Sequence, residues 1–109
     1  MSYAYTVRCR FDDPQVAERW ARWMEAEHFQ DLLDAGALRA ELVGLQGEGT
    51  TLECRYLFAD QAAFHRYQEQ HGPRLRAEGL SRFPLALGLH YSRSEGPVRL
   101  SRTPAPGQV

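Results

Sequence analysis

The sequences WMEAEH at residues 23–28 and YQEQHGP at residues 67–73 decide the fold, because each is an amphipathic helical stretch that runs into a histidine. A glycine follows each histidine at the same distance, Gly36 in the first case and Gly79 in the second. Each stretch lies between two segments that alternate like β-strands, so the chain has the order strand-helix-strand twice. With right-handed crossovers, this order predicts an α+β, ferredoxin-like fold (β-α-β-β-α-β), with a four-stranded antiparallel sheet and helices on one face.

Alternation of apolar and polar residues predicts the four strands. They cover residues 3–11, 37–46, 50–59 and 85–93. In this register the tyrosines and phenylalanines of the strands face the helices. We expect a single domain over residues 1–96 and a loosely ordered C-terminal tail over residues 97–109, where the composition shifts to Ser, Thr, Pro and Gly.

The first helix is expected to begin at Pro14, behind the capping residue Asp13. Its buried stripe consists of Val16, Trp20, Trp23 and Met24. The apolar residues past His28 project onto roughly the opposite side of an uninterrupted helix, and a straight helix cannot bury both sets against one sheet. These residues are Phe29, Leu32 and Leu33. We therefore predict a bend or break near His28 and another at His71, so that each helix is broken near its C-terminal histidine.

Composition and charge disfavour several classes of function. The chain has 109 residues and a net charge of −1, which gives no electrostatic basis for binding nucleic acid or an anionic membrane. No apolar run approaches the roughly 20 residues of a membrane helix, and the N-terminus has no signal pattern, so we expect a cytoplasmic protein. All 13 basic residues are arginine, and lysine, isoleucine and asparagine are absent. Their codons are AT-rich, which favours a bacterial gene from a GC-rich genome.

Motifs for cofactors and metals are missing from the sequence. Cys9 and Cys54 fall at inward strand positions, where a free cysteine packs as a small hydrophobe. Two thiols without C-x-x-C spacing cannot build a four-cysteine zinc site. No phosphate-binding, dinucleotide-binding or nucleophile-elbow motif occurs. We expect no cofactor and no metal.

The outward strand positions mix opposite charges with a few apolar residues. They are Thr6, Arg8, Arg10, Arg39, Glu41, Val43, Leu45, Glu53, Arg55, Leu57, Ala86, Gly88, His90 and Ser92. An RNA-recognition domain of this fold would place aromatic residues on this face, and their absence disfavours RNA binding. We expect a homodimer through this open sheet face, because a small domain gains core by association. The alternative is a solvated face with cross-strand ion pairs.

Four parts of the sequence carry a resemblance to a known family. They are Tyr5-Thr6-Val7-Arg8, Trp20-x-x-Trp23-Met24-x-x-x-His28, Tyr67-x-x-x-His71-x-Pro73-x-Leu75-Arg76, and Phe83. Together they resemble the bacterial domain-of-unknown-function family 4286, over roughly residues 3 to 93. The resemblance implies a ferredoxin-like fold of the dimeric α/β-barrel group, and no catalytic residue, since the family has no established activity. Members often have proline two residues after the first histidine, where this chain has Gln30.

The candidate catalytic residues are His28, Asp31 and His90. Asp31 lies three positions after His28, close enough on a helix to orient the imidazole as a general base. The alternative is that His28 binds a backbone carbonyl freed at the break. A cavity enclosed by the dimer at the open face would bind an anionic ligand. Its expected ligand-binding residues are Arg8, Arg10, Arg55 and His90.

Two functions remain. The favoured one is a non-catalytic homodimer that binds a small ligand or a protein partner. The alternative is a cofactor-free oxygenase or isomerase of the dimeric α/β-barrel type, acting on an aromatic or polyketide-like small molecule, and it rests on analogy of fold. The two functions differ in what the dimer encloses: a closed cavity of about 300 Å³ or more, lined by a histidine and apolar walls, would favour the enzyme. A filled dimer interface would favour the binding protein.

Overall fold

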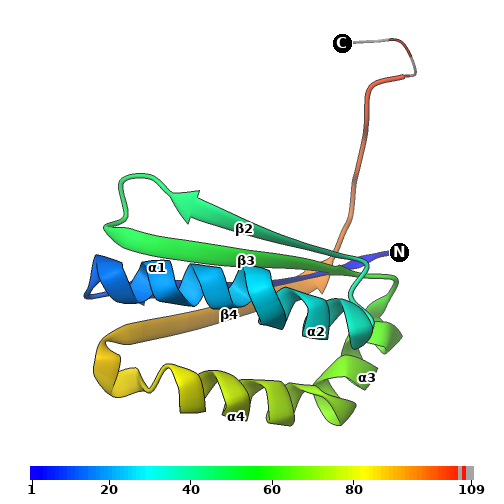
Figure 1. Ribbon diagram of the computed structural model, residues 1–109. Helices are drawn as coiled ribbons and strands as arrows, with labels where there is room; N and C mark the ends of the chain where they lie inside the picture. Colours follow the sequence, from blue (N-terminus) through cyan, green and yellow to red (C-terminus); the bar gives the residue numbers. More distant parts are fainter. Residues whose placement is uncertain (106, 108–109) are drawn as a thin grey trace.

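A four-stranded antiparallel sheet in the order β2-β3-β1-β4 forms one layer of the protein, and the helices lie on one side of it (Figure 1). The computed structural model describes residues 1–105 and 107. The elements are β1 (Tyr3–Phe11), α1 (Pro14–Trp23), a π-helical turn η1 (Met24–His28), α2 (Phe29–Asp34), β2 (Arg39–Leu45), β3 (Thr50–Phe58), α3 (Gln61–Gln70), α4 (Gly72–Arg82), a 3₁₀ turn η2 (Leu85–Leu87) and β4 (Leu89–Pro97). The predicted ferredoxin-like fold is confirmed.

The core lies between the sheet and the helices, because one face of each central strand is aromatic. The odd-numbered positions of β1 and the even-numbered positions of β3 face inward, and Tyr5 pairs with Tyr56 in the antiparallel register. Phe64 of α3 is fully buried. The centroid of its ring lies 5.2 Å from that of Tyr3, 4.9 Å from that of Tyr5 and 5.3 Å from that of Phe58. This aromatic packing attaches α3 to the sheet. Cys9 and Cys54 are free and buried, as predicted.

The first helix runs from α1 into α2 without ending at His28. Asp13 caps it by accepting a hydrogen bond from the backbone N–H of Gln15, and Pro14 is its first residue. At η1 the helix widens to π geometry, and the N–H of Phe29 donates to the carbonyl of Met24, five residues earlier. The structure therefore has a π-helical turn where we expected a bend or break.

The π-helical turn explains the shift of the apolar stripe. It adds one residue to a helical turn and so rotates everything after it by about 100° relative to an α-helix. As a result, Leu32 is fully buried and Phe29 packs edge-on against Tyr56, with ring centroids 5.7 Å apart. Trp20 and Trp23 are buried on the same side of the helix. One continuous helix thus buries both sets of residues.

The second helical segment is divided at His71. The helix α3 ends at Gln70, and α4 begins at Gly72, immediately before Pro73. The backbone N–H of His71 donates to the carbonyl of Tyr67, and its Nδ1 lies 3.0 Å from the Arg74 guanidinium. The helix in the first half of the chain therefore continues through His28, whereas in the second half one helix ends before His71 and another begins after it.

The prediction for the fourth strand was wrong at its start. Residues Leu85 to Leu87 form the turn η2, and β4 extends from Leu89 to Pro97. Gly88 separates them with a φ of +89°, and a Cβ there would lie 2.7 Å from Oδ2 of Asp12. Apolar residues at alternate positions imitated a strand, but Leu85 and Leu87 are exposed. Ala86 and Gly88 consequently do not belong to the open sheet face.

The end of the chain leaves the sheet after β4 (Figure 1). Because Tyr3 pairs with Pro97, the sheet continues one residue past the expected domain limit at residue 96. Val98 still donates a backbone hydrogen bond to Ser2, and residues 98–105 form no helix or strand. The expected tail over 97–109 includes residues 106, 108 and 109, which lie outside the described residues.

Candidate functional site: a pocket between the sheet and the helices

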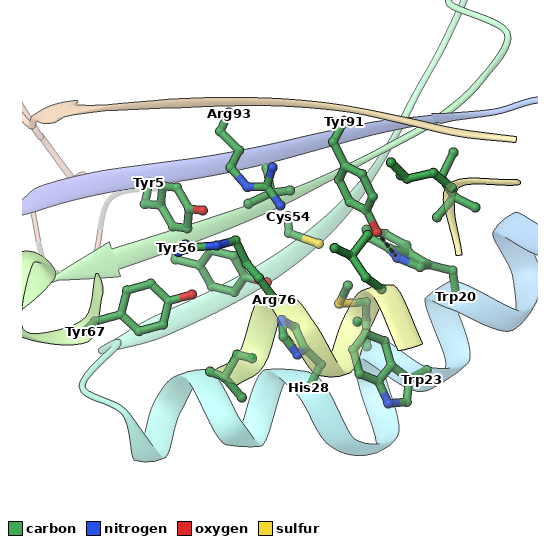
Figure 2. Close-up of a pocket in the computed structure, with 17 residues that line it drawn as sticks. Tyr5, Trp20, Trp23, His28, Cys54, Tyr56, Tyr67, Arg76, Tyr91 and Arg93 are labelled. Atoms are coloured by element: carbon green, nitrogen blue, oxygen red, sulfur yellow. Dashed lines mark hydrogen bonds between the residues drawn. The ribbon is translucent and has the colours of Figure 1, made fainter. Parts of the chain in front are cut away.

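A pocket of about 350 Å³ lies between the inner face of the sheet and the helices (Figure 2). Strands β1, β3 and β4 supply one wall, and α1, η1 and α4 supply the other. The walls are mainly apolar and aromatic, with Trp20 and Trp23 from the helical side. This volume is within the range of small-molecule sites, about 300–1,000 Å³.

Four tyrosines line the pocket, namely Tyr5, Tyr56, Tyr67 and Tyr91. The hydroxyl oxygen of Tyr91 accepts a hydrogen bond from the indole N–H of Trp20, at 3.1 Å. Burial raises the pKa of Tyr67 and of Tyr91 to about 12, and the pKa of Tyr56 well above its usual value. All three hydroxyls are therefore protonated at neutral pH, and those of Tyr67 and Tyr91 are available as hydrogen-bond donors, whereas that of Tyr56 interacts with the Cys54 thiol.

His28 closes the π-helical turn and faces this pocket (Figure 2). Its ring stacks on Trp23, with centroids 4.7 Å apart, and its Nδ1 is buried without a hydrogen-bond partner among the described residues. Burial lowers the pKa of His28 to about 4, although the charge of Asp31 opposes that shift. The imidazole is therefore neutral at pH 7. Over residues 1–105 and 107, the expected hydrogen bond from His28 to a freed backbone carbonyl is absent.

Two arginines enter the pocket from opposite walls, Arg76 from α4 and Arg93 from β4 (Figure 2). The Arg93 guanidinium lies 5.1 Å from the centroid of the Tyr91 ring. The charges of both arginines lower the pKa of Tyr67 against the larger effect of burial. Both positive charges therefore act at the same tyrosine hydroxyl.

The structure separates the two groups of residues that the sequence suggested as sites. His28 lines the pocket, and Asp31 is near it on α2, without a hydrogen bond between the two side chains among the described contacts. The other candidates, Arg8, Arg10, Arg55 and His90, are on the open face of the sheet and do not line the pocket.

The candidates on the open face are paired with acids of the same face. Glu53 lies 3.0 Å from Arg8 and 2.7 Å from Arg55, and it is only 6% exposed. Asp12 lies 3.0 Å from Arg10 and 3.1 Å from His90. The open face therefore holds its positive charges in ion pairs.

Sequence reasoning missed the pocket residues other than His28. One signal was available, because Tyr5, Tyr56 and Tyr91 place hydroxyls at inward strand positions, where a phenylalanine would fill a core equally well. Arg93 continues the inward series of Leu89 and Tyr91, and a charged residue at such a position keeps contact with solvent, as the exposed Arg93 does.

Two other features are absent from the part of the chain that the structure describes. Over residues 1–105 and 107, no three His, Cys, Asp or Glu side chains gather closely enough to hold a metal ion. Within the same residues, no helix has the length and apolar character needed to cross a bilayer.

Fold and pocket together define a ferredoxin-like α+β domain with a cavity beneath its helix-covered face. The family model described as domain of unknown function (DUF4286) matches residues 2–87, and the chain belongs to this family. The resemblance inferred from the sequence is thereby confirmed. No curated protein sequence is significantly similar to the chain.

Several solved structures share the fold at low sequence identity. A dimeric ferredoxin-like protein from an uncultured marine organism has a TM-score of 0.74 at 11% identity, over 95% of this chain and 100% of that one. The ActVA-Orf6 monooxygenase of Streptomyces coelicolor, solved with nanaomycin D, has a TM-score of 0.72 at 15% identity, over 95% of this chain and 93% of that one. SnoaB of Streptomyces nogalater, a cofactor-independent oxygenase, has a TM-score of 0.59 at 15% identity, over 92% and 95%.

Proposed function

We propose that this protein is a homodimer that binds a planar aromatic small molecule in the pocket between the sheet and the helices. The observation that carries the proposal is a cavity of about 350 Å³ walled by tryptophan and tyrosine rings. Aromatic walls favour flat ligands, because offset stacking and edge contacts add roughly 0.5–1.5 kcal/mol for each ring pair beyond the burial of area. This proposal gives the favoured small-ligand function a location, on the helix-covered side of the sheet.

Tryptophan fluorescence tests the pocket directly, since the two tryptophans of the chain both line it. We expect 2-naphthol to quench the emission saturably and its saturated analogue decahydro-2-naphthol to bind at least tenfold more weakly. Leu80→Phe should abolish quenching, because the half-exposed Leu80 lines the pocket and a larger ring fills it. The matched control is Ala77→Phe, on the same helix but exposed and away from the pocket. Equal binding by both variants would contradict the proposal.

The open face of the sheet is the proposed dimer interface. It combines the apolar Val43, Leu45 and Leu57 with the Glu53 ion-pair network, and a twofold axis can place acid against base across such a mixed face. Two solved structures of the same fold are described as dimeric, which supports this arrangement.

Light scattering after size-exclusion chromatography tests the dimer. The expected mass is twice the monomer mass of 12.5 kDa. Leu57→Arg on the open face should give a monomer, whereas Leu33→Arg, at an exposed position on α2, should leave the dimer intact. A monomeric wild-type protein at micromolar concentration would exclude the dimer.

A second candidate function is a cofactor-free oxygenase that uses His28 as a proton acceptor. The observation that favours it is the neutral imidazole in the pocket wall with a buried, unpartnered Nδ1. An acidic C–H or phenolic O–H would transfer its proton to the imidazole of His28. The resulting electron-rich anion would then reduce O₂. Two solved structures of this fold are oxygenases, which supports the candidate.

Oxygen uptake with anthrone tests the second candidate. The CH₂ group of anthrone and one O₂ give a ketone and one water, so one oxygen atom enters the product and the other leaves as water. We expect uptake above the rate in buffer, and a loss of at least 100-fold in His28→Phe with naphthol binding retained. Uptake no faster than in buffer would exclude this candidate and leave the binding function unaffected.

A further inference from the structure

Among the arginines of this protein that form no ion pair over the described residues, Arg76 and Arg93 are the two that line the aromatic pocket. Arg8, Arg10, Arg39, Arg55 and Arg82 all form ion pairs with acidic side chains. Over the described residues, neither Arg76 nor Arg93 has such a partner, and both line the pocket. In Figure 2 their side chains extend toward the middle of the pocket from opposite walls.

Arg93 is held in place by the sheet and by an aromatic ring. It pairs with Val7 of β1 and shares the inward face of β4 with Tyr91, on whose ring its guanidinium lies at 5.1 Å. A guanidinium that stacks through its face keeps its N–H groups free at the edge. The donors of Arg93 are therefore available to a ligand in the pocket.

The acids nearest to these arginines along the chain are already bound elsewhere. Glu95, two positions after Arg93, accepts a hydrogen bond of 2.7 Å from the Tyr3 hydroxyl and does not line the pocket. Glu78 on α4 lies 3.9 Å from Arg82. The pocket contains no carboxylate among its lining residues, so its charged side chains are all positive.

A third donor, the Tyr67 hydroxyl, lines the same pocket. The Tyr67 hydroxyl is protonated because burial raises its pKa to about 12, and both Arg76 and Arg93 act on it electrostatically. Two guanidinium groups and the Tyr67 hydroxyl thus line one cavity whose walls are mainly apolar and aromatic. This arrangement matches an anionic oxygen on a flat hydrophobic body.

We propose that the pocket selects planar aromatic acids, with the carboxylate or phenolate of the ligand bound between Arg76 and Arg93. The proposal rests on the aromatic pocket of the proposed function and specifies its ligand class. The ring system of the ligand packs among the tryptophan and tyrosine side chains, and its acidic group takes the place of the missing protein carboxylate.

Calorimetric titration with 2-naphthoate and 2-naphthamide tests the proposal. The two probes have nearly the same shape, but only the first is charged at pH 7. We expect naphthoate to bind at least tenfold more tightly to the wild-type protein. Arg76→Gln and Arg93→Gln should each weaken naphthoate about tenfold and leave naphthamide unchanged, so that the double variant binds both probes equally. Unchanged naphthamide affinity also reports that the variant pocket is intact.

Arg74→Gln is the matched control, because Arg74 is exposed on α4 and contacts His71 outside the pocket. It should retain the full preference for naphthoate. Equal wild-type affinities for the two probes would overturn the selection of acids while leaving the aromatic pocket in place. If Arg74→Gln lowered the affinity for naphthoate as much as Arg76→Gln does, the selection of acids by the pocket would also be overturned. The general positive charge of the protein would then explain the preference for naphthoate. Binding of neither probe would overturn both proposals.

Discussion

Charged side chains form ion pairs on the open face of the sheet, whereas polar side chains on its inner face lack such partners among the described residues. On the open face, Arg8 and Arg55 both contact Glu53, and Arg10 shares Asp12 with His90. On the inner face, Nδ1 of His28 is buried without a partner, and the guanidinium groups of Arg76 and Arg93 lack an acid among the described residues. The ion pairs of the open face thus satisfy its charged side chains within one protomer. Unsatisfied groups around a cavity are the better guide to a ligand site.

The largest effect is expected where aromatic packing holds the inner face together. Trp20→Ala should lower the free energy of unfolding by about 3–5 kcal/mol, because a fully buried indole is replaced by a cavity. Arg55→Ala on the open face should cost less than about 1 kcal/mol, since its ion pair is half exposed. Urea unfolding of both variants at one protein concentration gives the comparison. Similar losses would show that the two faces do not differ in this way.

A smaller effect is expected when the pH is lowered. The pKa of His28 is about 4 in the folded protein and about 6.5 when unfolded, so the unfolded chain binds more protons between these values. The contribution of His28 is present above pH 6.5 and is lost as the pH falls toward 4. Between pH 7 and pH 5 it should lower the free energy of unfolding by about 2 kcal/mol.

Urea unfolding at pH 7 and at pH 5 measures that loss. His28→Gln should remove it, because the substituted side chain does not titrate. The matched control is His65→Gln, at an exposed position on α3. If both substitutions changed the pH dependence equally, the burial of His28 in the pocket wall would not be its cause.

The smallest effect concerns the ion pairs of the open face. Glu53→Gln should lower the free energy of unfolding by about 1 kcal/mol, because the carboxylate is buried but both of its arginine partners are half exposed. Hydrogen bonds and charges from Arg55 and Arg8 hold the pKa of Glu53 below its usual value. Glu48→Gln, at an exposed partner of Arg8, should change little. The difference in stability between the Glu53→Gln and Glu48→Gln variants should shrink in 1 M NaCl, because salt screens ion pairs. A difference that remained unchanged in 1 M NaCl would indicate a packing role for Glu53.

Most of the fold could be predicted from the sequence because it follows from local periodicity. The alternation from Tyr3 to Phe11 and the cap at Asp13 are local signals, and the structure retains them. The fourth strand was misplaced because Leu85 and Leu87 alternate like strand residues, whereas the left-handed conformation of Gly88 depends on a contact with Asp12. That contact joins distant parts of the chain, and no window of sequence contains it.

The site was less predictable than the fold. His28 was a candidate because Asp31 lies three positions after it, where a carboxylate on a helix can orient the imidazole, and this signal is local. Arg76 and Arg93 were not candidates, because they come from α4 and β4 and meet only in the folded protein. A cavity also depends on how side chains from distant elements pack against one another, and the hydrophobic periodicity of the sequence does not predict this.

The π-helical turn carries a consequence for insertions and deletions in this family. Removing the exposed Ala26 would turn the hydrogen bond between Phe29 and the Met24 carbonyl into an ordinary α-helical one. Both apolar stripes would then still face the sheet in an unbroken α-helix. The chain thus has one residue here that the packing of the helix does not require, and that residue belongs to the turn that ends in His28. A homologue that had lost it would keep the architecture and give up the wide turn beside the pocket.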